Sequence, residues 1–323
     1  MAFNQNAAED QSYGHKPVLL DECLAALNIK PNGIYLDGTL GRAGHSLEIV
    51  RRLDQGGRLI GVDRDETALA AARVRLAEYM DRVTLVHSNF SCVGQILDEL
   101  GLPAIDGMLF DLGVSSPQLD DAERGFSYMH DAPLDMRMDR TAGLTARDVV
   151  NEWSYEELRR ILFEYGEERY APVIAKRICQ AREEAPIETT LELTEIIKRA
   201  MPPQALREKQ HPAKRSFQAI RIAVNGELDE LVPMMEAAVD HLNPGGRLAI
   251  ISFHSLEDRI VKKTMQRLAT GCTCPPEFPV CVCGKKPKVH LVSRKPIVSG
   301  KAELAYNPRA RSAKLRVAEK EEE

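Results

Sequence analysis

Short apolar runs recur along the first third of the chain, and polar stretches of helical character separate them. The runs are rich in β-branched or bulky residues, which predicts strands. Such short apolar runs are typical of parallel strands that are covered on both faces. The alternation of strand and helix therefore predicts an α/β fold with a Rossmann-like parallel sheet between layers of helices. The predicted strands are residues 33–38, 58–63, 83–88, 107–113 and, much later, 247–253.

The alternation stops after the fourth predicted strand. Residues 115–213 show almost no strand pattern and contain three helical stretches, the last of which Thr189 or Thr190 can cap. This pattern predicts an all-helical domain inserted into one α/β domain. A further helix is predicted over 218–241, kinked or divided at Pro233. The helical stretches of the insertion are 148–166, 169–184 and 191–201.

The end of the chain predicts two more strands, 288–298 and 313–320, whose charged residues suit the edge of a sheet. The expected organisation follows from these elements. A polar tail is expected to be disordered, a discontinuous sheet domain is expected to surround the insertion, and the insertion is expected to recognise the substrate. The ranges are 1–14 for the tail, 15–114 and 214–318 for the sheet domain, and 115–213 for the insertion.

Composition places the chain among globular proteins of a reducing compartment. It has 323 residues, of which 44% are hydrophobic and 28% charged, enough to fill the cores of about two domains. No apolar run approaches the roughly 20 residues of a membrane-spanning helix. The polar start lacks the features of a secretory signal peptide, and three of the seven cysteines are scattered singly. We therefore expect a cytoplasmic protein that does not act at a membrane.

Charge is distributed unevenly along the chain, although the net charge is only −5. Residues 1–168 carry 16 Lys and Arg against 29 Asp and Glu, whereas residues 259–317 carry 14 against 2. Residues 169–221 are also basic, with 11 against 6. Such asymmetry predicts a basic face for a polyanion beside an acidic half. A solubilising surface is the alternative interpretation of the same excess.

A glycine-rich turn follows the first predicted strand. Gly38, Gly41 and Gly44 lie in YLDGTLGRAGHS, residues 35–46, and a helix is expected to begin at about Ala43 or Gly44. Glycines allow a sharp turn and close approach of a ligand to the backbone, and the free N–H groups of the helix face the same space. Asp63 ends the second strand, where a carboxylate accepts hydrogen bonds from ribose. Turn and carboxylate together predict a nucleoside cofactor.

Two cofactor classes share this topology. A pyrophosphate-binding loop has the spacing G-x-G-x-x-G, which this loop lacks, and Asp37 beside it is unfavourable for pyrophosphate. S-adenosylmethionine carries a sulfonium and an ammonium group and no phosphate, so Asp37, Asp63 and Asp111 at strand ends suit it. Phe90, after the third strand, is a candidate to lie against adenine or is a packing residue. The pattern therefore favours S-adenosylmethionine over a nicotinamide cofactor.

Six long motifs together resemble one family, the bacterial ribosomal RNA small subunit methyltransferase H family, over about residues 15–320. The loop Ser115-Ser116-Pro117-Gln118 after the fourth strand loosely fits the catalytic loop of enzymes that methylate exocyclic amines. The motifs are HKPVLLDE (15–22), DGTLGRAGHS (37–46), FDLGVSSPQLDDAERGFSYMHDAPLDMRMD (110–139), HPAKRSFQAIRIAVNGEL (211–228), PGGRLAIISFHSLEDRIVK (244–262) and NPRARSAKLRVAEK (307–320).

The resemblance implies an activity, a partner and a set of cofactor contacts. The activity is methyl transfer from S-adenosylmethionine to N4 of a cytidine in the decoding centre of 16S rRNA, near the P site. The partner is 16S rRNA or the small ribosomal subunit. The implied cofactor contacts, to which the loop analysis adds Asp37, are Ala43, Gly44, His45, Asp63, Phe90, Asp111 and Gln118.

The chemistry of the implied reaction suggests further residues. The N4 lone pair is delocalised into the ring, so in-line positioning about 3–3.5 Å from the methyl group supplies much of the rate. Ser116 is the candidate acceptor for an N4 proton, with Ser115 as an alternative, and both hydroxyls can instead cap a turn. Phe253 is the candidate to stack on the unstacked base. His254 either contacts the base or has a structural role.

Basic residues of two motifs are candidates for phosphate contacts, with surface ion pairs as the alternative. They are Lys214, Arg215, Arg221, Arg309 and Arg311.

Four further cysteines lie within 12 residues, in CTCPPEFPVCVCGKK. They suggest a zinc site, but C-x-C is tighter than the usual C-x₂-C, and a redox-sensitive loop is the alternative. The sequence alone therefore assigns no metal ligand. The four are Cys272, Cys274, Cys281 and Cys283.

Two other functions remain open at this point. One is a ribosome-binding or assembly factor with a vestigial cofactor pocket, which the intact glycines and carboxylates disfavour. The other is a nicotinamide oxidoreductase, which the loop spacing disfavours. A cofactor-binding titration distinguishes the first from an enzyme.

Overall fold

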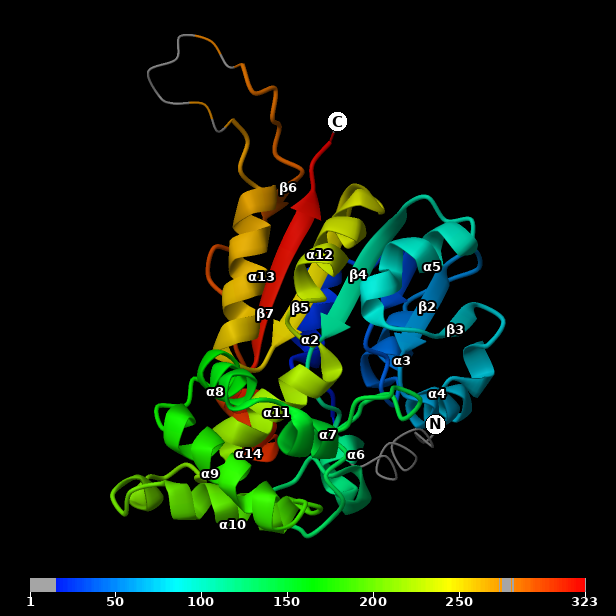
Figure 1. The fold of residues 1–323 in the computed structure, drawn as a ribbon. Coiled ribbons are helices and arrows are strands. Elements are labelled where there is room, and N and C mark those ends of the chain that lie inside the picture. Colours follow the sequence, from blue (N-terminus) through cyan, green and yellow to red (C-terminus); the bar gives the residue numbers. More distant parts are fainter. Residues whose placement is uncertain (1–15, 273, 275–279, 281, 323) are drawn as a thin grey trace. The chain divides into compact units, whose positions relative to one another are not determined.

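The computed structural model of the protein describes residues 16–272, 274, 280 and 282–322. They form two compact units (Figure 1). The sheet unit comprises Met1–Leu112 and Leu231–Glu323, and the helical unit comprises Gly113–Glu230. The tail predicted over 1–14 lies outside the described residues.

The sheet unit contains a seven-stranded sheet in the order β3-β2-β1-β4-β5-β7-β6. Neighbouring strands from β3 to β5 are parallel, whereas β7 is antiparallel to both β5 and β6. The predicted α/β fold with a parallel sheet is therefore confirmed. The strands are β1 (Ile34–Asp37), β2 (Arg58–Asp63), β3 (Val83–His87), β4 (Ile105–Asp111), β5 (Leu242–Ser252), β6 (Val289–Leu291) and β7 (Lys314–Lys320).

Helices cover both faces of this sheet. The helices α2, α3 and α4 share one apolar cluster with alternate residues of the strands, among them Leu59, Leu109 and Ile251. The helices α5, α12 and α13 lie on the opposite face, where α12 contacts both others (Figure 1). The helices of this unit are α2 (Leu20–Leu27), α3 (Gly44–Val50), α4 (Glu66–Arg75), α5 (Val93–Glu99), α12 (Leu231–Asp240), α13 (Ser255–Leu268) and α14 (Lys301–Tyr306).

The two C-terminal strands form, but the prediction that both lie at the edge of the sheet is wrong for β7. Of these two strands, β6 lies at an edge of the sheet, whereas β7 lies between β5 and β6. The charged residues of β7 have partners inside the unit. Lys314 Nζ and Arg316 Nε lie 2.9 and 2.7 Å from the carboxylate of Asp258 on α13. These ion pairs neutralise the charged side chains of β7, which would otherwise favour a position at the solvent-exposed edge of the sheet.

Helices form a second core in the helical unit together with loop residues, among them Phe126, Leu134, Met136 and Met138. The described residues of this unit form no strand, as the lack of strand pattern predicts. The stretch predicted over 148–166 is two helices, α7 and α8, because Ser154 begins a new one with a capping box to Glu157. Thr189 caps α10 through a similar box. The helices of this unit are α6 (Ser116–Asp120), α7 (Ala146–Glu152), α8 (Tyr155–Glu164), α9 (Ala171–Glu184), α10 (Thr190–Ala200) and α11 (Lys214–Asn225).

The predicted helix 218–241 is divided, but not at Pro233. The first helix, α11, ends at Gly226, which caps it with φ 62°. Pro233 lies in the first turn of α12, where a backbone N–H group would have no partner within the helix, so proline is tolerated there. The first part, α11, belongs to the helical unit, since Phe217 and Ile220 are buried in its core. The expected boundary at residue 213 therefore differs from the observed one at Glu230.

Across the described part of the chain, no helix combines the length and apolar character that crossing a bilayer requires.

Candidate functional site

Three carboxylates end neighbouring strands of the sheet unit. Asp37, Asp63 and Asp111 are the last residues of β1, β2 and β4. The strand β1 pairs in parallel with both β2 and β4, so the carboxyl ends of all three strands meet at one edge. In open α/β sheets this edge is where ligands bind. The arrangement therefore brings together the three carboxylates that the sequence predicted for the cofactor.

The glycine-rich turn between β1 and α3 approaches this edge closely. Gly41 and Ala43 have φ of 51° and 57°, and α3 begins at Gly44, as predicted. A Cβ atom at Gly38 would overlap the ring of Phe110 on β4. Glycine is therefore required at position 38 by the neighbouring strand, while the left-handed residues turn the chain into the helix.

Asp37 shapes this turn from inside. Its carboxylate is buried and accepts hydrogen bonds from the Ser46 hydroxyl at 2.7 Å and the Thr39 N–H at 3.2 Å. Burial raises the pKa of Asp37 to about 6, and the two donors partly offset that rise. The group is therefore mostly ionised at neutral pH.

Asp63 anchors the other side of the turn. Its Oδ2 accepts the Gly41 N–H at 2.7 Å, and its Oδ1 accepts the Asp65 N–H at 2.9 Å. Burial raises the pKa of Asp63, against the effect of these donors. Each oxygen retains a second lone pair, so the carboxylate can hold the turn and still accept a hydrogen bond from a ligand.

Asp111 differs from Asp37 and Asp63 because hydrogen bonds offset less of the cost of burying its carboxylate. Its Oδ1 is buried and has no hydrogen-bond partner among the residues that the structure describes. Burial, and after it the negative charges of Asp37 and Glu257, raise the pKa of Asp111 to about 8. An oxygen of this kind needs a donor or a cation, since a buried unpaired acceptor is costly.

His45, in the first turn of α3, faces Asp111 without neutralising it. Its Nε2 donates to the Val18 carbonyl at 2.9 Å, and burial lowers the pKa of His45 to about 4. The ring is therefore neutral at pH 7, and its unprotonated Nδ1 lies 3.9 Å from Oδ2 of Asp111. Such a contact supplies neither a proton nor a positive charge to the carboxylate.

These features fit a cationic ligand. Neither Asp37 nor Asp111 forms an ion pair with Lys or Arg within the described ranges, and the charge of Asp37 acts on the carboxyl of Asp111, whose Oδ1 has no hydrogen-bond partner there. The sulfonium and ammonium groups of S-adenosylmethionine carry the complementary charge. A pyrophosphate would be repelled by the same carboxylates. The residues present therefore fit S-adenosylmethionine better than a nicotinamide cofactor.

Two aromatic residues predicted for the site follow β3 and β5. Phe90 is buried, and its ring meets that of Phe110 edge-on at 6.2 Å, with the Arg64 guanidinium 5.4 Å from its centroid. Phe253 directly follows β5 and is partly buried against the sheet core. Both rings already have packing partners. Their predicted contacts with adenine and with the base remain predictions.

His254 has a structural role that the sequence left open. It is the N-cap of α13, and its Nδ1 accepts the Glu257 N–H at 3.4 Å. Glu257 is buried and accepts the N–H groups of Phe253 and His254 at 2.8 and 3.2 Å. Sequence reasoning missed Glu257, although the spacing of a capping residue and Glu three positions later is a known helix-start signal. Its charge contributes to the raised pKa of Asp111.

Two predicted site residues belong to the helical unit. Gln118 is buried within α6, and its Oε1 accepts the Ser115 N–H at 3.0 Å. Ser116 is the first residue of α6, and the placement of its side chain lies outside what the structure describes. The backbone contact of Gln118 orders the start of the loop that the sequence assigned to catalysis.

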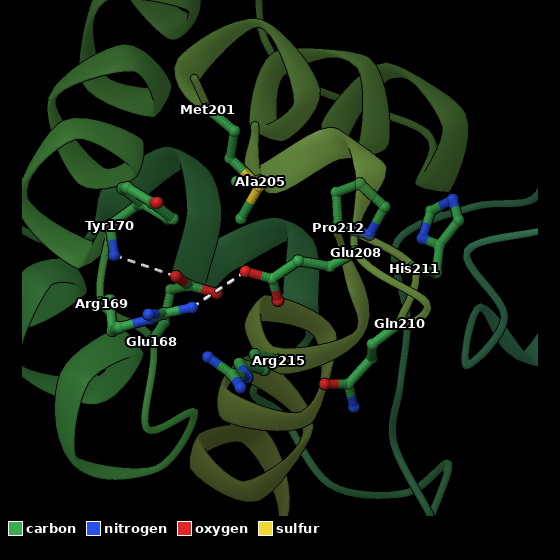
Figure 2. Close-up of a pocket in the computed structure, with 10 residues that line it drawn as sticks. All are labelled: Glu168, Arg169, Tyr170, Met201, Ala205, Glu208, Gln210, His211, Pro212 and Arg215. Atoms are coloured by element: carbon green, nitrogen blue, oxygen red, sulfur yellow. Dashed lines mark hydrogen bonds and ion pairs between the residues drawn. The ribbon is translucent and has the colours of Figure 1, made fainter. Parts of the chain in front are cut away.

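Figure 2 shows a pocket of the helical unit beside the basic start of α11. Glu168 and Glu208 line it together with Arg169 and Arg215, and Arg169 lies 2.9 Å from Glu208. Its charges are therefore balanced, and it contains none of the predicted cofactor residues. Phosphate binding inside this pocket is not favoured by that charge balance.

The other predicted phosphate contacts divide into paired and exposed residues. Arg221 forms a bidentate ion pair with Glu227 at 2.7 and 2.8 Å. For Arg221 the structure therefore supports the alternative role, an ion pair within the protein. Arg311 and Lys214 are exposed. The side chain of Arg309 is outside the described part.

Comparisons with known proteins show which family the chain belongs to. A family model described as the MraW methylase family matches residues 12–321. A relative from Brevibacillus brevis (strain 47 / JCM 6285 / NBRC 100599), named ribosomal RNA small subunit methyltransferase H, is 58% identical over 96% of this chain and 98% of its own. A relative of the same name from Paenibacillus sp. (strain JDR-2) is 59% identical, over 95% and 99%. A solved putative rRNA-methylase from Clostridium thermocellum aligns over 99% of this chain and 100% of its own, with 10% identity and a TM-score of 0.43.

Proposed function

Since the chain belongs to the MraW methylase family, whose members use S-adenosylmethionine, we propose that it methylates N4 of a cytidine in the decoding centre of 16S rRNA, near the P site. The observation that carries the cofactor half of this proposal is the unpartnered, buried Oδ1 of Asp111 at an acidic strand edge. The RNA half is supported by relatives named as ribosomal RNA small subunit methyltransferases. The proposed substrate implies a cytoplasmic protein and no membrane partner.

The proposed cofactor contacts come from the strand edge and the glycine-rich turn. Bound S-adenosylmethionine would supply an electrophilic methyl group on a sulfonium. Asp111 and Asp37 stabilise positive charge, and Asp63 accepts a hydrogen bond from ribose. The turn brings backbone N–H groups close to the ligand. The remaining proposed contacts are Ala43, Gly44, His45, Phe90 and Gln118.

The proposed acceptor is a weak nucleophile, so the protein's task is to orient it. Phe253 stacks on the unstacked cytosine at the end of β5 and fixes the plane of the base. The Ser116 hydroxyl accepts a hydrogen bond from an N4–H group as the nitrogen becomes tetrahedral, and the proton is released to water. His254 is excluded from this proposal as a proton acceptor, because its Nδ1 is engaged in capping α13.

The product tests this function directly. Nucleoside mass spectrometry should find N4-methylcytidine in 16S rRNA, or in small subunits, from cells with the gene and none at that site without it. Direct attack by an exocyclic amine needs no covalent adduct, whereas methylation at cytosine C5 generally uses a cysteine nucleophile. Cys179→Ser, which alters a cysteine of α9, should therefore leave methyl transfer intact. Finding 5-methylcytidine, or an RNA adduct on a cysteine, would contradict the assigned chemistry.

Asp63→Ala should weaken S-adenosylmethionine binding about tenfold or more, because hydrogen bonds to a charged acceptor contribute about 1.5–3 kcal/mol each. The loss has two sources, since Asp63 also holds the Gly41 N–H. Calorimetry with S-adenosylhomocysteine and its ribose-deoxy analogues separates them. If Asp63 binds ribose, the deoxy analogues lose affinity for the wild type but not for the variant. If the deoxy analogues lose the same affinity for both proteins, Asp63 shapes the turn and does not bind ribose.

A further inference from the structure

The segment between α13 and β6 leaves and re-enters the sheet unit at one place. The Lys288 N–H donates to the Leu268 carbonyl at 2.9 Å, and the Glu321 N–H donates to the Lys288 carbonyl at 3.0 Å. Gly271 lies beside Pro287 at the base of the segment. The described ends of the segment are thus held together by backbone contacts, independently of what lies between them.

The described valines of this segment are not buried by apolar packing. Val280 and Val282 leave 70% and 74% of their surface exposed. Hydrophobic burial is the usual source of order in a chain segment, and small segments that lack it often use a metal or a disulfide instead. The cysteines of this segment are therefore the groups to consider.

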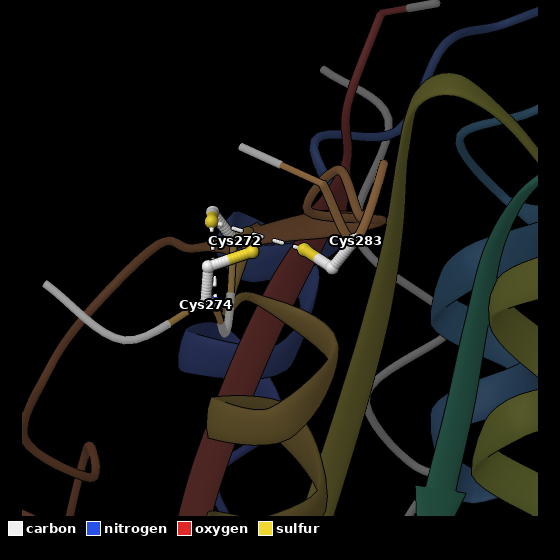
Figure 3. Close-up of side chains that lie close together, drawn as sticks. All are labelled: Cys272, Cys274 and Cys283. Carbon is white, nitrogen blue, oxygen red and sulfur yellow. Dashed lines mark hydrogen bonds between the residues drawn. The ribbon is translucent and has the colours of Figure 1, made fainter. Parts of the chain in front are cut away.

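Three thiols converge at the base of the segment (Figure 3). The Sγ atoms of Cys272, Cys274 and Cys283 all lie within 4.8 Å of one another. The Sγ atoms of Cys283 and Cys272 are 3.8 Å apart, and the Cys274 N–H approaches the Cys272 Sγ at 3.4 Å. An N–H directed at sulfur stabilises the thiolate form, which is the form that binds metals.

The sulfur spacing distinguishes a metal site from a disulfide. A disulfide requires about 2.05 Å between sulfurs. Four thiolates at about 2.3 Å from a tetrahedral zinc ion are about 3.8 Å from one another by geometry alone. The observed 3.8 Å matches the edge of such a tetrahedron.

We propose that Cys272, Cys274 and Cys283 bind a structural Zn²⁺ ion that ties the two ends of the segment together. Soft thiolate ligands select zinc over Mg²⁺ or Ca²⁺. Each thiol releases its proton on binding, so three thiolates and one Zn²⁺ carry a net charge of −1. Lys285 and Lys286 follow Cys283 closely in the sequence and offset that charge. Cys281, a fourth thiol in the sequence, lies outside the described residues, and the structure assigns no fourth ligand.

Metal content of the purified full-length chain tests the proposal. Protein prepared under reducing conditions with zinc should contain about one Zn²⁺ per chain by inductively coupled plasma mass spectrometry. The triple variant C272S/C274S/C283S should lose it, whereas Cys179→Ser, on α9 of the helical unit, should retain it. A wild-type protein without zinc, zinc retained by the triple variant, or iron in place of zinc would each overturn the proposal.

A second measurement keeps the proposal testable if the triple variant does not fold. Wild-type protein loaded with Co²⁺ should show strong sulfur-to-cobalt charge-transfer absorption and the visible bands of a tetrahedral ion. Removing the metal with a chelator should make the segment between Leu268 and Lys288 several-fold more susceptible to proteolysis. Octahedral cobalt bands, or a proteolysis rate that the chelator does not change, would contradict a structural thiolate site. Both readouts are independent of methyltransferase activity.

Discussion

Asp111→Asn is expected to raise the thermal stability of the ligand-free protein at pH 8 and at the same time to lower its affinity for S-adenosylmethionine. Both effects arise because the folded protein raises the pKa of Asp111 to about 8 through burial and the charges of Asp37 and Glu257. A carboxyl whose pKa is higher in the folded than in the unfolded state favours folding when protonated. That contribution is fully present below its unfolded pKa of about 3.9 and is lost as pH rises through about 8.

The stabilising effect of Asp111→Asn should therefore grow between pH 5 and pH 8. The amide carries no charge, so the variant does not pay for ionising this buried group as pH rises. Thermal unfolding of both proteins across this range measures the difference. Asp81→Asn, at an exposed carboxylate of the sheet unit, serves as the control and should show no such trend. A difference in unfolding temperature that does not change with pH would refute the raised pKa.

Affinity should change in the opposite direction. A cationic ligand binds the ionised carboxylate, so wild-type affinity for S-adenosylmethionine should increase by up to about tenfold per pH unit from pH 6 to pH 7.5. Asp111→Asn should weaken binding by roughly 150- to 5,000-fold, because removing one charge of a buried pair commonly costs about 3–5 kcal/mol. Calorimetric titration should find most of the pH dependence gone in the variant. Unchanged affinity would remove Asp111 from the cofactor site.

Gly125→Ala should destabilise the helical unit by roughly 3 kcal/mol or more, which is large relative to the stability of a typical domain. Gly125 has φ 70°, which costs about 1–2 kcal/mol for other residues, and a Cβ there would overlap the Pro133 carbonyl and lie 2.9 Å from the Asp135 N. Backbone atoms cannot move aside as a flexible side chain does. The turn after Arg124 should therefore be forced open.

Gly226→Ala provides a matched control for that change. It has a similar φ of 62° at the end of α11, but the nearest atom to its added Cβ is 3.8 Å away. Its cost should be limited to the backbone conformation, about 1–2 kcal/mol. Denaturant unfolding of both variants measures the difference. Equal destabilisation by the two substitutions would mean that the overlap at Gly125 is relieved at little cost.

The local pattern of the sequence determined most of the sheet unit. Strands that are short and uniformly apolar are specified by their own residues, and the turn before α3 is specified by its glycines. Because the carboxyl ends of parallel strands meet at one edge, residues at those ends were predictable as neighbours without coordinates. This is how Asp37, Asp63 and Asp111 were identified together, although up to 74 positions separate them in the sequence.

The tertiary structure decided what depends on partners distant in the sequence. The interior position of β7 follows from its pairing with β5 and β6, and two of its charges find a partner in Asp258, 56 and 58 residues away. The assignment of α11 to the helical core follows from packing of Phe217 that no local pattern encodes. The raised pKa of Asp111 and the 3.8 Å spacing of two cysteine sulfurs are likewise properties of packing. Burial, charge and distance depend on which groups surround a residue in space, so the sequence proposed the chemical groups and only the fold set their environment.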